Sequence, residues 1–576
     1  MTEALEVMSR SLLAELYRGR LRWDLAHPFP DRDADESRAG DEAVQAAAEF
    51  ARARIDPAAV EESRALPDGL LTTLHRSRYL ALRVPTELGG LGLSLFDASR
   101  VIEAIGSWSL TVGYLMAVHD GLGAAAYLPL LAPGELRDLV LRGIAEGRLF
   151  ADADTEPTGA ANNGRVTTAT PVDGGRAYVL NGEKVFVATG GPAGLLTVSA
   201  TLSEGCSDVV RVFFVESSCP GFCVRAIHDL VGLRGLPIAA LALEGVRVPR
   251  ERMLPADDGL WRLSPRLSAI WATGRLEVLG VAALTIGRLC VGWARDFIRR
   301  RAVDGRPLGG YEAIQRLVAM SVADVFAIES VLRWCFLGGV GLEHRYDMAV
   351  AKNITTCACW RVVERTMSLL AAEGAETAPS KARRGAVDWP LERAWRDARL
   401  LRIAGGVDFR VDIFLAATRM LPPYLDEAWS GPETAEPELD AGPLSPENRD
   451  HLAAVVEGAR ELAAGCRRLA LRHPERADLL ARERPLILLH RAASELLTMT
   501  CVLARAAGGQ GPSHARAQTL AGVWCAEARR RLAGIRAELE RGGDPGWART
   551  AEWWLAEDGD LDLPGSAGSG ASGRSR

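Results

Sequence analysis

Apolar residues recur three and four positions apart over most of this chain, and that spacing predicts amphipathic α-helices. The helical spacing covers residues 41–55, 95–128, 272–302 and 311–340. Between about 151 and 255 apolar residues alternate with polar ones instead, as they do in strands with one buried face. This change of period predicts a compact β domain between helical regions, with strands at 195–202, 209–216 and 240–249.

Two local signals refine this pattern. Residues 177–191 read AYVLNGEKVFVATGG, and Asn181-Gly182 within them predicts a two-residue turn between the strands of a hairpin. Ser445-Pro446 is typical of an N-cap followed by the first helical position. The helix that follows is predicted to bury one face, formed by Leu452, Val455, Val456, Ala459, Leu462, Ala463 and Cys466.

The elements predict a mainly α protein with a small inserted β domain. The chain divides into an N-terminal arm at 1–40, a helical N-terminal domain at 41–150, a middle β domain at 151–255, a helical bundle at 256–420, a linker at 421–443, a C-terminal helical domain at 444–560 and a disordered tail at 561–576.

Composition narrows the class of protein. The chain has 576 residues, of which 48% are hydrophobic and 25% charged, with a net charge of -6. These values are ordinary for a soluble protein and give no reason to expect nucleic acid as a partner. Ten cysteines without a CxxC pair predict reduced thiols and no metal site. With no secretory signal and no apolar run of about 18 residues, we expect a cytoplasmic protein.

One stretch raises a question about chemistry. WRDARLLRIAGGVDF, residues 395–409, begins as a helix with charged and apolar faces and then breaks at Gly405-Gly406. Paired glycines end helices because they adopt backbone conformations that other residues avoid. The tip of this helix therefore carries no side chain.

Several motifs occur in a fixed order along the chain. They are Thr155-Glu156-Pro157, Leu180-Asn181-Gly182, Gly232-Leu233-Arg234-Gly235, Arg301 with Gly305 and Pro307-Leu308, and Trp395-Arg396-Asp397-Ala398. In this order they resemble the acyl-CoA dehydrogenase family. The added C-terminal helices make the chain most similar to its very-long-chain branch, and the resemblance covers nearly the whole chain.

The resemblance implies a fold and a reaction. The fold has a helical N-terminal domain, a β-barrel-like middle domain, a four-helix-bundle domain and a C-terminal helical domain. The reaction is α,β-dehydrogenation of an acyl thioester with FAD. A glutamate removes the α-proton while hydride leaves the β-carbon, and hydrogen bonds stabilise the thioester oxygen.

The family's catalytic glutamate is missing. Its position is Gly405, and the position that some members use instead, before an arginine that matches Arg275, is Gly274. Glu277 and Asp408 are weak substitutes. Glu277 is otherwise a helix carboxylate paired with an arginine, and Asp408 a loop aspartate. Arg275 binds the substrate's carboxylate or thioester, or it caps a helix.

Residues expected at the flavin also depart from the family. By resemblance the cofactor-binding positions are Thr155, Phe186, Thr189, Arg301 and Gly374. The hydroxyl residue that faces the flavin becomes Ala188, with Thr189 adjacent, and the neighbouring tryptophan becomes Phe186. Further changes fall on Ala160-Ala161-Asn162, Asp304, Ser368, Ala371 and Ala372. Residues that hold the fold remain, whereas many that touch flavin are changed.

Three functions stay open. The chain is a divergent flavoenzyme acting on acyl-CoA or acyl-carrier protein, with electron-transfer flavoprotein as a possible acceptor. Alternatively it is a catalytically silent subunit of a heteromer, or a flavin monooxygenase, for which His119 is the only sequence support. A homodimer is the default, because the family shares its cofactor site between subunits. We expect the C-terminal helices to pack on the protein rather than on a membrane.

Overall fold

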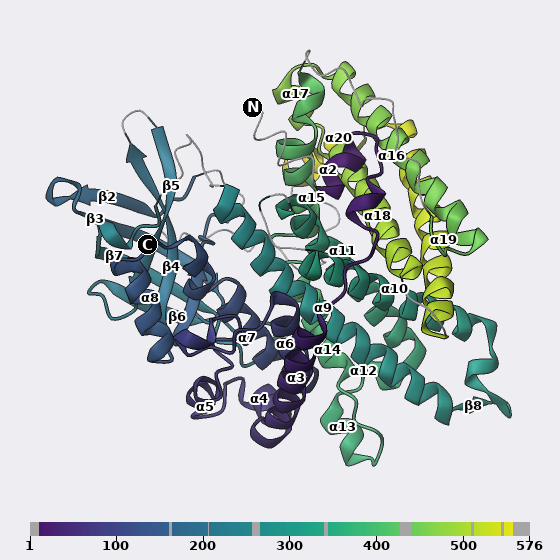
Figure 1. Cartoon of the computed structure of the whole chain (residues 1–576), viewed down its shortest axis with the longest axis horizontal. Coiled ribbons are helices and arrows are strands. Elements are labelled where there is room, and N and C mark those ends of the chain that lie inside the picture. The colour runs from purple at the N-terminus through teal and green to yellow at the C-terminus, as the bar shows by residue number, and fades with distance from the viewer. Residues whose placement is uncertain are drawn as a thin grey trace.

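The structure is a computed structural model that describes residues 11–159, 164–204, 207–255, 265–338, 342, 344–426, 441–508, 512–542 and 546–556. The β domain lies at one end of the molecule and the C-terminal helices lie at the other (Figure 1). The long helix α9, Pro265–Arg300, runs between them. The fold is the mainly α architecture with an inserted sheet that the sequence predicts.

The N-terminal region is helical up to residue 145. Its helices are α2 Leu12–Tyr17, α3 Ala34–Arg54, α4 Pro57–Ser63, α5 Leu70–Arg76, α6 Leu95–Trp108, α7 Leu110–Gly121 and α8 Glu135–Ala145. The helical prediction for 41–55 is confirmed by α3. The prediction for 95–128 resolves into α6, α7 and a short 3-10 segment, because the backbone is extended at Ser109.

The middle region forms one twisted sheet. Its strands are β1 Leu149–Ala153, β2 Thr168–Val172, β3 Ala177–Val187, β4 Ala193–Glu204, β5 Ser207–Glu216, β6 Phe222–Ile227 and β7 Ala239–Pro249. Their order is β1-β4-β2-β3-β7-β6, with β5 paired to β4. The three strands predicted from alternation are confirmed as β4, β5 and β7.

The predicted hairpin at Asn181-Gly182 is wrong. Both residues lie inside the continuous strand β3, which pairs with β2 on one side and β7 on the other. The pairing of β3 with β7 shifts register between Leu180 and Asn181. A Cβ at Gly182 would lie 2.5 Å from the Thr167 hydroxyl, so glycine serves close packing here, not a turn.

Helices return after residue 265. They are α9, then α10 Glu312–Leu337, α11 Arg345–Leu370, α12 Ala372–Ala375, α13 Ala378–Arg383, α14 Leu391–Leu401, α15 Asp408–Leu415, α16 Pro446–Arg472, α17 Arg476–Leu480, α18 Glu483–Ala507, α19 Pro512–Arg541 and α20 Gly546–Ala556. A two-stranded ribbon, β8 Ala302–Val303 with β9 Arg306–Pro307, joins α9 to α10. One hydrophobic core extends from α2 and the N-terminal helices through α9–α11 to α18 and α19.

The C-terminal helices pack on the rest of the protein. The Ser445 hydroxyl accepts a hydrogen bond from the Asn448 backbone at 3.3 Å, which confirms the predicted N-cap of α16. All residues of its predicted apolar face are buried. The Tyr17 hydroxyl of α2 lies 2.9 Å from His490 Nδ1 of α18. Most of the predicted linker and the whole of the predicted tail lie outside the described residues.

Two helices are long and apolar enough to pass a composition test for membrane spans, α9 and α18. Their apolar windows are 72% and 78% buried inside the protein. Such burial is typical of core helices in soluble proteins, so the test is weak evidence for a membrane segment.

Candidate active site

The Gly405-Gly406 turn faces helix α9. After α14 ends at Leu401, Gly405 and Gly406 adopt φ values of 65° and 104°, the region that favours glycine. A Cβ at Gly405 would lie 3.0 Å from Leu279 Cδ1 and 3.4 Å from Arg275 Cγ. The position that the resemblance assigns to the catalytic glutamate therefore lies directly against Arg275, and here it offers no functional group.

Two cations lie beside this turn. Arg275 is partly buried and makes no hydrogen bond or ion pair with any residue that the structure describes. Burial lowers its pKa, and the charges of Asp154 and Asp152 oppose that shift. Lys352 Nζ donates to the Gly406 carbonyl at 2.6 Å, and burial lowers the pKa of Lys352 to about 8. Lys352 thus holds the Gly405-Gly406 turn. Arg275 borders the turn and has no direct partner among the described residues.

Strand β1 brings carboxylates toward the same arginine. Asp152 Oδ1 accepts a hydrogen bond from Thr197 at 2.7 Å. Asp154 is held by Arg165 at 2.8 Å and by the Ser199 hydroxyl at 2.6 Å. Neither aspartate was predicted as a site residue, although the alternation in ADADTE, residues 151–156, indicates two carboxylates on one face of a strand.

Glu277 lies on a different face of α9 from Arg275. Its side chain is fully buried, and one carboxylate oxygen lies 3.3 Å from Arg83. Arg83 donates from Nε to Asp120 at 2.5 Å. Burial raises the pKa of Glu277 well above its usual range. This geometry matches a paired helix carboxylate between α7 and α9, while the Gly405 turn contacts the opposite side of α9.

Asp408 begins α15 and is already engaged. Arg402 donates from Nε at 3.0 Å, and the Phe409 backbone donates to the other carboxylate oxygen at 2.8 Å. Burial raises the pKa of Asp408, but these hydrogen bonds outweigh it and the pKa is lowered. A carboxylate stabilised in this way is a poor proton acceptor at neutral pH.

His119 is sealed in the core. Its Nε2 lies 2.8 Å from the Leu80 carbonyl, and its Nδ1 accepts from the Phe150 backbone at 2.9 Å. Burial lowers its pKa to about 4, so the ring is neutral at physiological pH. Both ring nitrogens serve backbone groups, as in a hydrogen-bonded core histidine, and nothing in this geometry favours a monooxygenase.

The part of the predicted flavin site that would hold the flavin ring, which we call the ring half, fits a planar aromatic group. Phe186 is 59% exposed and stacks on His228 at 4.7 Å, so one aromatic face is open. Thr155 is partly exposed at the end of β1. Thr189 is fully buried, and its hydroxyl lies 2.9 Å from the Phe150 carbonyl, turned away from solvent. Phe186 and Thr155 therefore suit the ring, whereas Thr189 does not present its hydroxyl.

In the part of the predicted flavin site that would hold the phosphates, which we call the phosphate half, a carboxylate competes for the arginine. Arg301 lies 3.3 Å from Glu373. Ala371, in the place of a family glycine, has φ 52° and ψ -130°. Gly374 packs on the Met367 carbonyl, which a Cβ would approach to 3.0 Å. A phosphate bound by Arg301 would compete with Glu373 for the guanidinium. Positions 160–162, which the resemblance also assigns to this half, lie outside the described residues.

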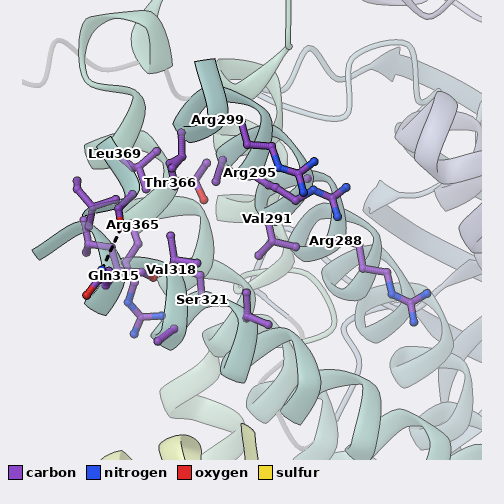
Figure 2. Close-up of a pocket in the computed structure, with 18 residues that line it drawn as sticks. Arg288, Val291, Arg295, Arg299, Gln315, Val318, Ser321, Arg365, Thr366 and Leu369 are labelled. Atoms are coloured by element: carbon purple, nitrogen blue, oxygen red, sulfur yellow. Dashed lines mark hydrogen bonds between the residues drawn. The ribbon is translucent and has the colours of Figure 1, made fainter. Parts of the chain in front are cut away.

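A groove of about 740 Å³ lies next to the phosphate half. Figure 2 shows Arg295 and Arg299 of α9 on one side, with Val318 of α10 and Leu369 of α11 on the other. Leu369 is two residues from Ala371, and Arg299 is two residues from Arg301. The groove is distinct from the Gly405 turn. In the part of the chain that the structure describes, no group of His, Cys, Asp and Glu side chains is arranged to hold a metal ion.

Comparisons with known proteins fit this arrangement. Family models of the acyl-CoA dehydrogenase N-terminal, middle and C-terminal domains match residues 38–148, 151–246 and 272–409. Together they cover more than half of the chain. The chain belongs to the acyl-CoA dehydrogenase family.

Individual relatives share different parts of the chain. The probable acyl-CoA dehydrogenase FadE10 of Mycobacterium tuberculosis is 30% identical over 405 residues, which are 69% of this chain and 61% of that protein. The mitochondrial very long-chain specific acyl-CoA dehydrogenase of Homo sapiens is 24% identical and covers 91% of this chain and 83% of its own. A Bacillus anthracis acyl-CoA dehydrogenase, solved in complex with FAD, shares the fold, with a TM-score of 0.71, 19% identity and 91% of each chain covered.

Proposed function

We propose that this chain is a divergent FAD-dependent oxidoreductase that dehydrogenates the α,β-bond of an acyl thioester carried on CoA or on an acyl-carrier protein. The observation that supports this most is Arg275, whose stem lies against the Gly405 turn and whose guanidinium has no hydrogen-bond or ion-pair partner among the described residues. A partly buried arginine without a direct partner favours an anionic or strongly polar ligand.

Arg275 is the proposed substrate-binding residue. Its guanidinium offers several N–H donors in a fixed plane, which suits a thioester oxygen or a carboxylate. A donor aimed at the thioester oxygen stabilises the negative charge that develops when the α-proton leaves. Lys352 contributes by fixing the Gly406 carbonyl, which keeps the turn against α9.

The cofactor assignment follows the two halves of the flavin site. Phe186 and Thr155 would hold the ring, and Arg301 and Gly374 would lie at the phosphates of a partner subunit's FAD. Bound FAD supplies the acceptor for the hydride that leaves the β-carbon. The open groove beside Arg301 supports a second subunit there, in a homodimer or a heteromer. A cytoplasmic location and electron-transfer flavoprotein as the acceptor are parts of the same proposal.

A silent subunit is the second candidate. Glu373 forms an ion pair with Arg301, the arginine that would bind phosphate. Ala371 places a methyl group where the resemblance expects a glycine. Both features weaken a phosphate site without harming the fold. They favour a chain that completes an assembly with an active homologue.

Flavin titration separates these candidates. We expect FAD to bind the purified chain weakly, and Glu373→Gln to tighten binding about fivefold because one anion is removed beside Arg301. Arg301→Gln is the matched control and should weaken binding. The measurement is quenching of FAD fluorescence, with calorimetry of acyl-CoA binding alongside. Absence of FAD binding in both the natural chain and Glu373→Gln would favour the silent subunit.

A further inference from the structure

The Gly405-Gly406 turn is the tip of a short loop between α14 and α15. The loop closes at its base, where the Asp408 backbone donates to the Arg402 carbonyl at 3.2 Å and Arg402 Nε donates to the Asp408 carboxylate at 3.0 Å. Neither glycine has a side chain that could anchor the tip, and paired glycines can adopt many backbone conformations. The place of the turn beside Arg275 therefore depends on contacts from other elements.

Helix α11 holds both the tip and the base of this loop. Lys352 Nζ donates to the Gly406 carbonyl at 2.6 Å. The next residue, Asn353, donates from Nδ2 to the Asp408 carbonyl at 2.8 Å and to Asp412 Oδ1 at 2.8 Å. Asn353 is buried, so these hydrogen bonds are sheltered from water. Two neighbouring side chains thus tie the loop and the start of α15 to α11.

Asp412 is the point at which the C-terminal helices reach these contacts. It lies one helical turn after Asp408 on α15, and its side chain is buried. Its Oδ1 accepts from Asn353, while Arg491 of α18 donates from Nε to its Oδ2 at 3.3 Å. Helices α15 and α18 also pack against each other. The carboxylate of Asp412 therefore joins α11, α15 and α18.

The negative charge of Asp412 makes both contacts possible. Burial raises the pKa of Asp412 to about 6, and the charge of Asp408 adds to the rise. The Asn353 hydrogen bond and the charge of Arg491 act in the opposite direction. Above pH 7 the side chain is a carboxylate, which accepts from two donors. Loss of Arg491 would favour the protonated form, which is a weaker acceptor for Asn353.

We propose that Arg491 of the C-terminal helical domain is a positioning residue of the candidate active site, holding the Gly405-Gly406 turn against Arg275 through Asp412 and Asn353. The consequence for substrate binding rests on the proposed function. Arg491 fixes Asp412, Asp412 fixes Asn353, and Asn353 fixes the base of the loop. The C-terminal helices then do more than complete the core, because they set where the turn meets the stem of the arginine that would bind the thioester.

The experiment follows hydrogen–deuterium exchange of the full-length chain at pH 7.5, by mass spectrometry of peptides spanning 402–412. The amides of Asp408, Arg410 and Val411 report on this loop, because each donates to a backbone carbonyl within it. Arg491→Gln should speed their exchange about fivefold, the effect expected from loss of one partly exposed ion pair. Arg491→Lys keeps the charge and should restore part of the protection.

Arg484→Gln is the matched control. Arg484 lies on the same helix and donates from Nε to Glu538 of α19 at 2.8 Å. Its side chain is 38% exposed and that of Arg491 is 45% exposed, but its ion pair leads to α19 instead of α15. The control should leave exchange over 402–412 unchanged. Asp412→Asn should match Arg491→Gln, and the two combined should add nothing further, because both remove the same charge contact.

Calorimetry with butyryl-, octanoyl- and palmitoyl-CoA tests the link to the site. Arg491→Gln should weaken thioester binding about threefold, because the turn beside Arg275 is no longer held in one place, and Arg484→Gln should not change it. The assignment is overturned if Arg491→Gln exchanges at the natural rate, if Arg484→Gln speeds exchange equally, or if faster exchange leaves thioester affinity unchanged. If none of the three thioesters binds the natural chain, the proposed function fails, and the exchange rates alone decide whether Arg491 positions the turn.

Discussion

Ala371 has a backbone conformation that suits glycine better than alanine. Ala371 has φ 52° and ψ -130°, a conformation that glycine adopts readily and alanine adopts at a cost. The resemblance assigns a glycine to this position, and the junction between α11 and α12 has a conformation that suits glycine.

Ala371→Gly should therefore stabilise the protein by about 1 kcal/mol, because relief of the strained backbone exceeds the added entropy of the unfolded chain. Chemical denaturation measures the free energy of unfolding. Ala372→Gly is the matched control. It lies in α12, where glycine lacks the intrinsic helix propensity of alanine, and should destabilise by up to about 1 kcal/mol. Equal effects of the two substitutions would rule out strain at Ala371.

At the scale of residues, part of the candidate site could be predicted from the sequence. Motif order predicted that Gly405 offers no functional group and that Arg275 lies beside it. The structure brings these two residues together. Asp152 was missed because no family position calls for a carboxylate there. Its electrostatic effect on Arg275 depends on tertiary structure, because the two residues are more than 100 positions apart in the sequence.

At the scale of elements, helices α7 and α9 approach closely around a buried charge cluster. A Cβ at Gly121 would lie 3.0 Å from the Gly274 backbone and 2.7 Å from a Glu277 carboxylate oxygen. A hydrogen bond between the Glu277 and Asp120 side chains raises the pKa of Glu277 and lowers that of Asp120. Arg83 is closer to Asp120 than to Glu277, so Asp120 carries the charge and Glu277 keeps its proton.

This contact makes stability depend on pH. The pKa of Glu277 is raised in the folded protein, so its contribution is complete below the unfolded value near 4.5 and is lost as pH rises toward the folded pKa. The free energy of unfolding should fall by up to about 1.4 kcal/mol per pH unit between those two values. Glu277→Gln should remove that fall and raise stability at pH 8, measured by urea denaturation between pH 5 and pH 8.

Asp120→Asn tests the other half of the cluster. The pKa of Asp120 is lowered, although burial alone would raise it, because Arg83 stabilises its charge. Its contribution is present above the unfolded pKa, so the substitution should cost about 3 kcal/mol at pH 7 by leaving Arg83 poorly compensated. If both substitutions changed stability in the same direction at pH 8, this division of charge would be incorrect.

Helices and strands were predicted correctly where the spacing of apolar residues was regular over several turns. The prediction failed where a short motif was compatible with either a turn or a strand. The buried face of α16 followed from a regular spacing over four turns, and packing against α18 and α19 fills it. Asn181-Gly182 carried a turn signal, but β3 has partners on both edges and tertiary pairing overrode the signal. The strands β1, β2 and β6 were not predicted; each has only five or six residues, too few for a firm period.

At the scale of the whole molecule, the C-terminal helices are part of the main core. Trp524 of α19 donates from Nε1 to Asp324 of α10 at 3.1 Å, and Arg505 of α18 lies 3.2 Å from Glu329 of the same helix. Leu496, Met499 and Cys501 of α18 belong to the cluster that contains α9–α11. Deleting these helices would expose the apolar surface of α10 and leave Asp324 without one of its donors.

A chain ending at residue 426 should therefore be insoluble or unfold well below the full chain, as followed by light scattering and circular dichroism. A chain ending at Arg541 is the matched control. It loses α20, whose large side chains Trp547 and Trp554 are 54% and 60% exposed and so add little to the core. It should unfold at the same temperature as the full chain. A soluble chain 1–426 with an unchanged melting temperature would make the C-terminal helices an independent domain, because a shared core cannot lose α18 and α19 without a loss of stability.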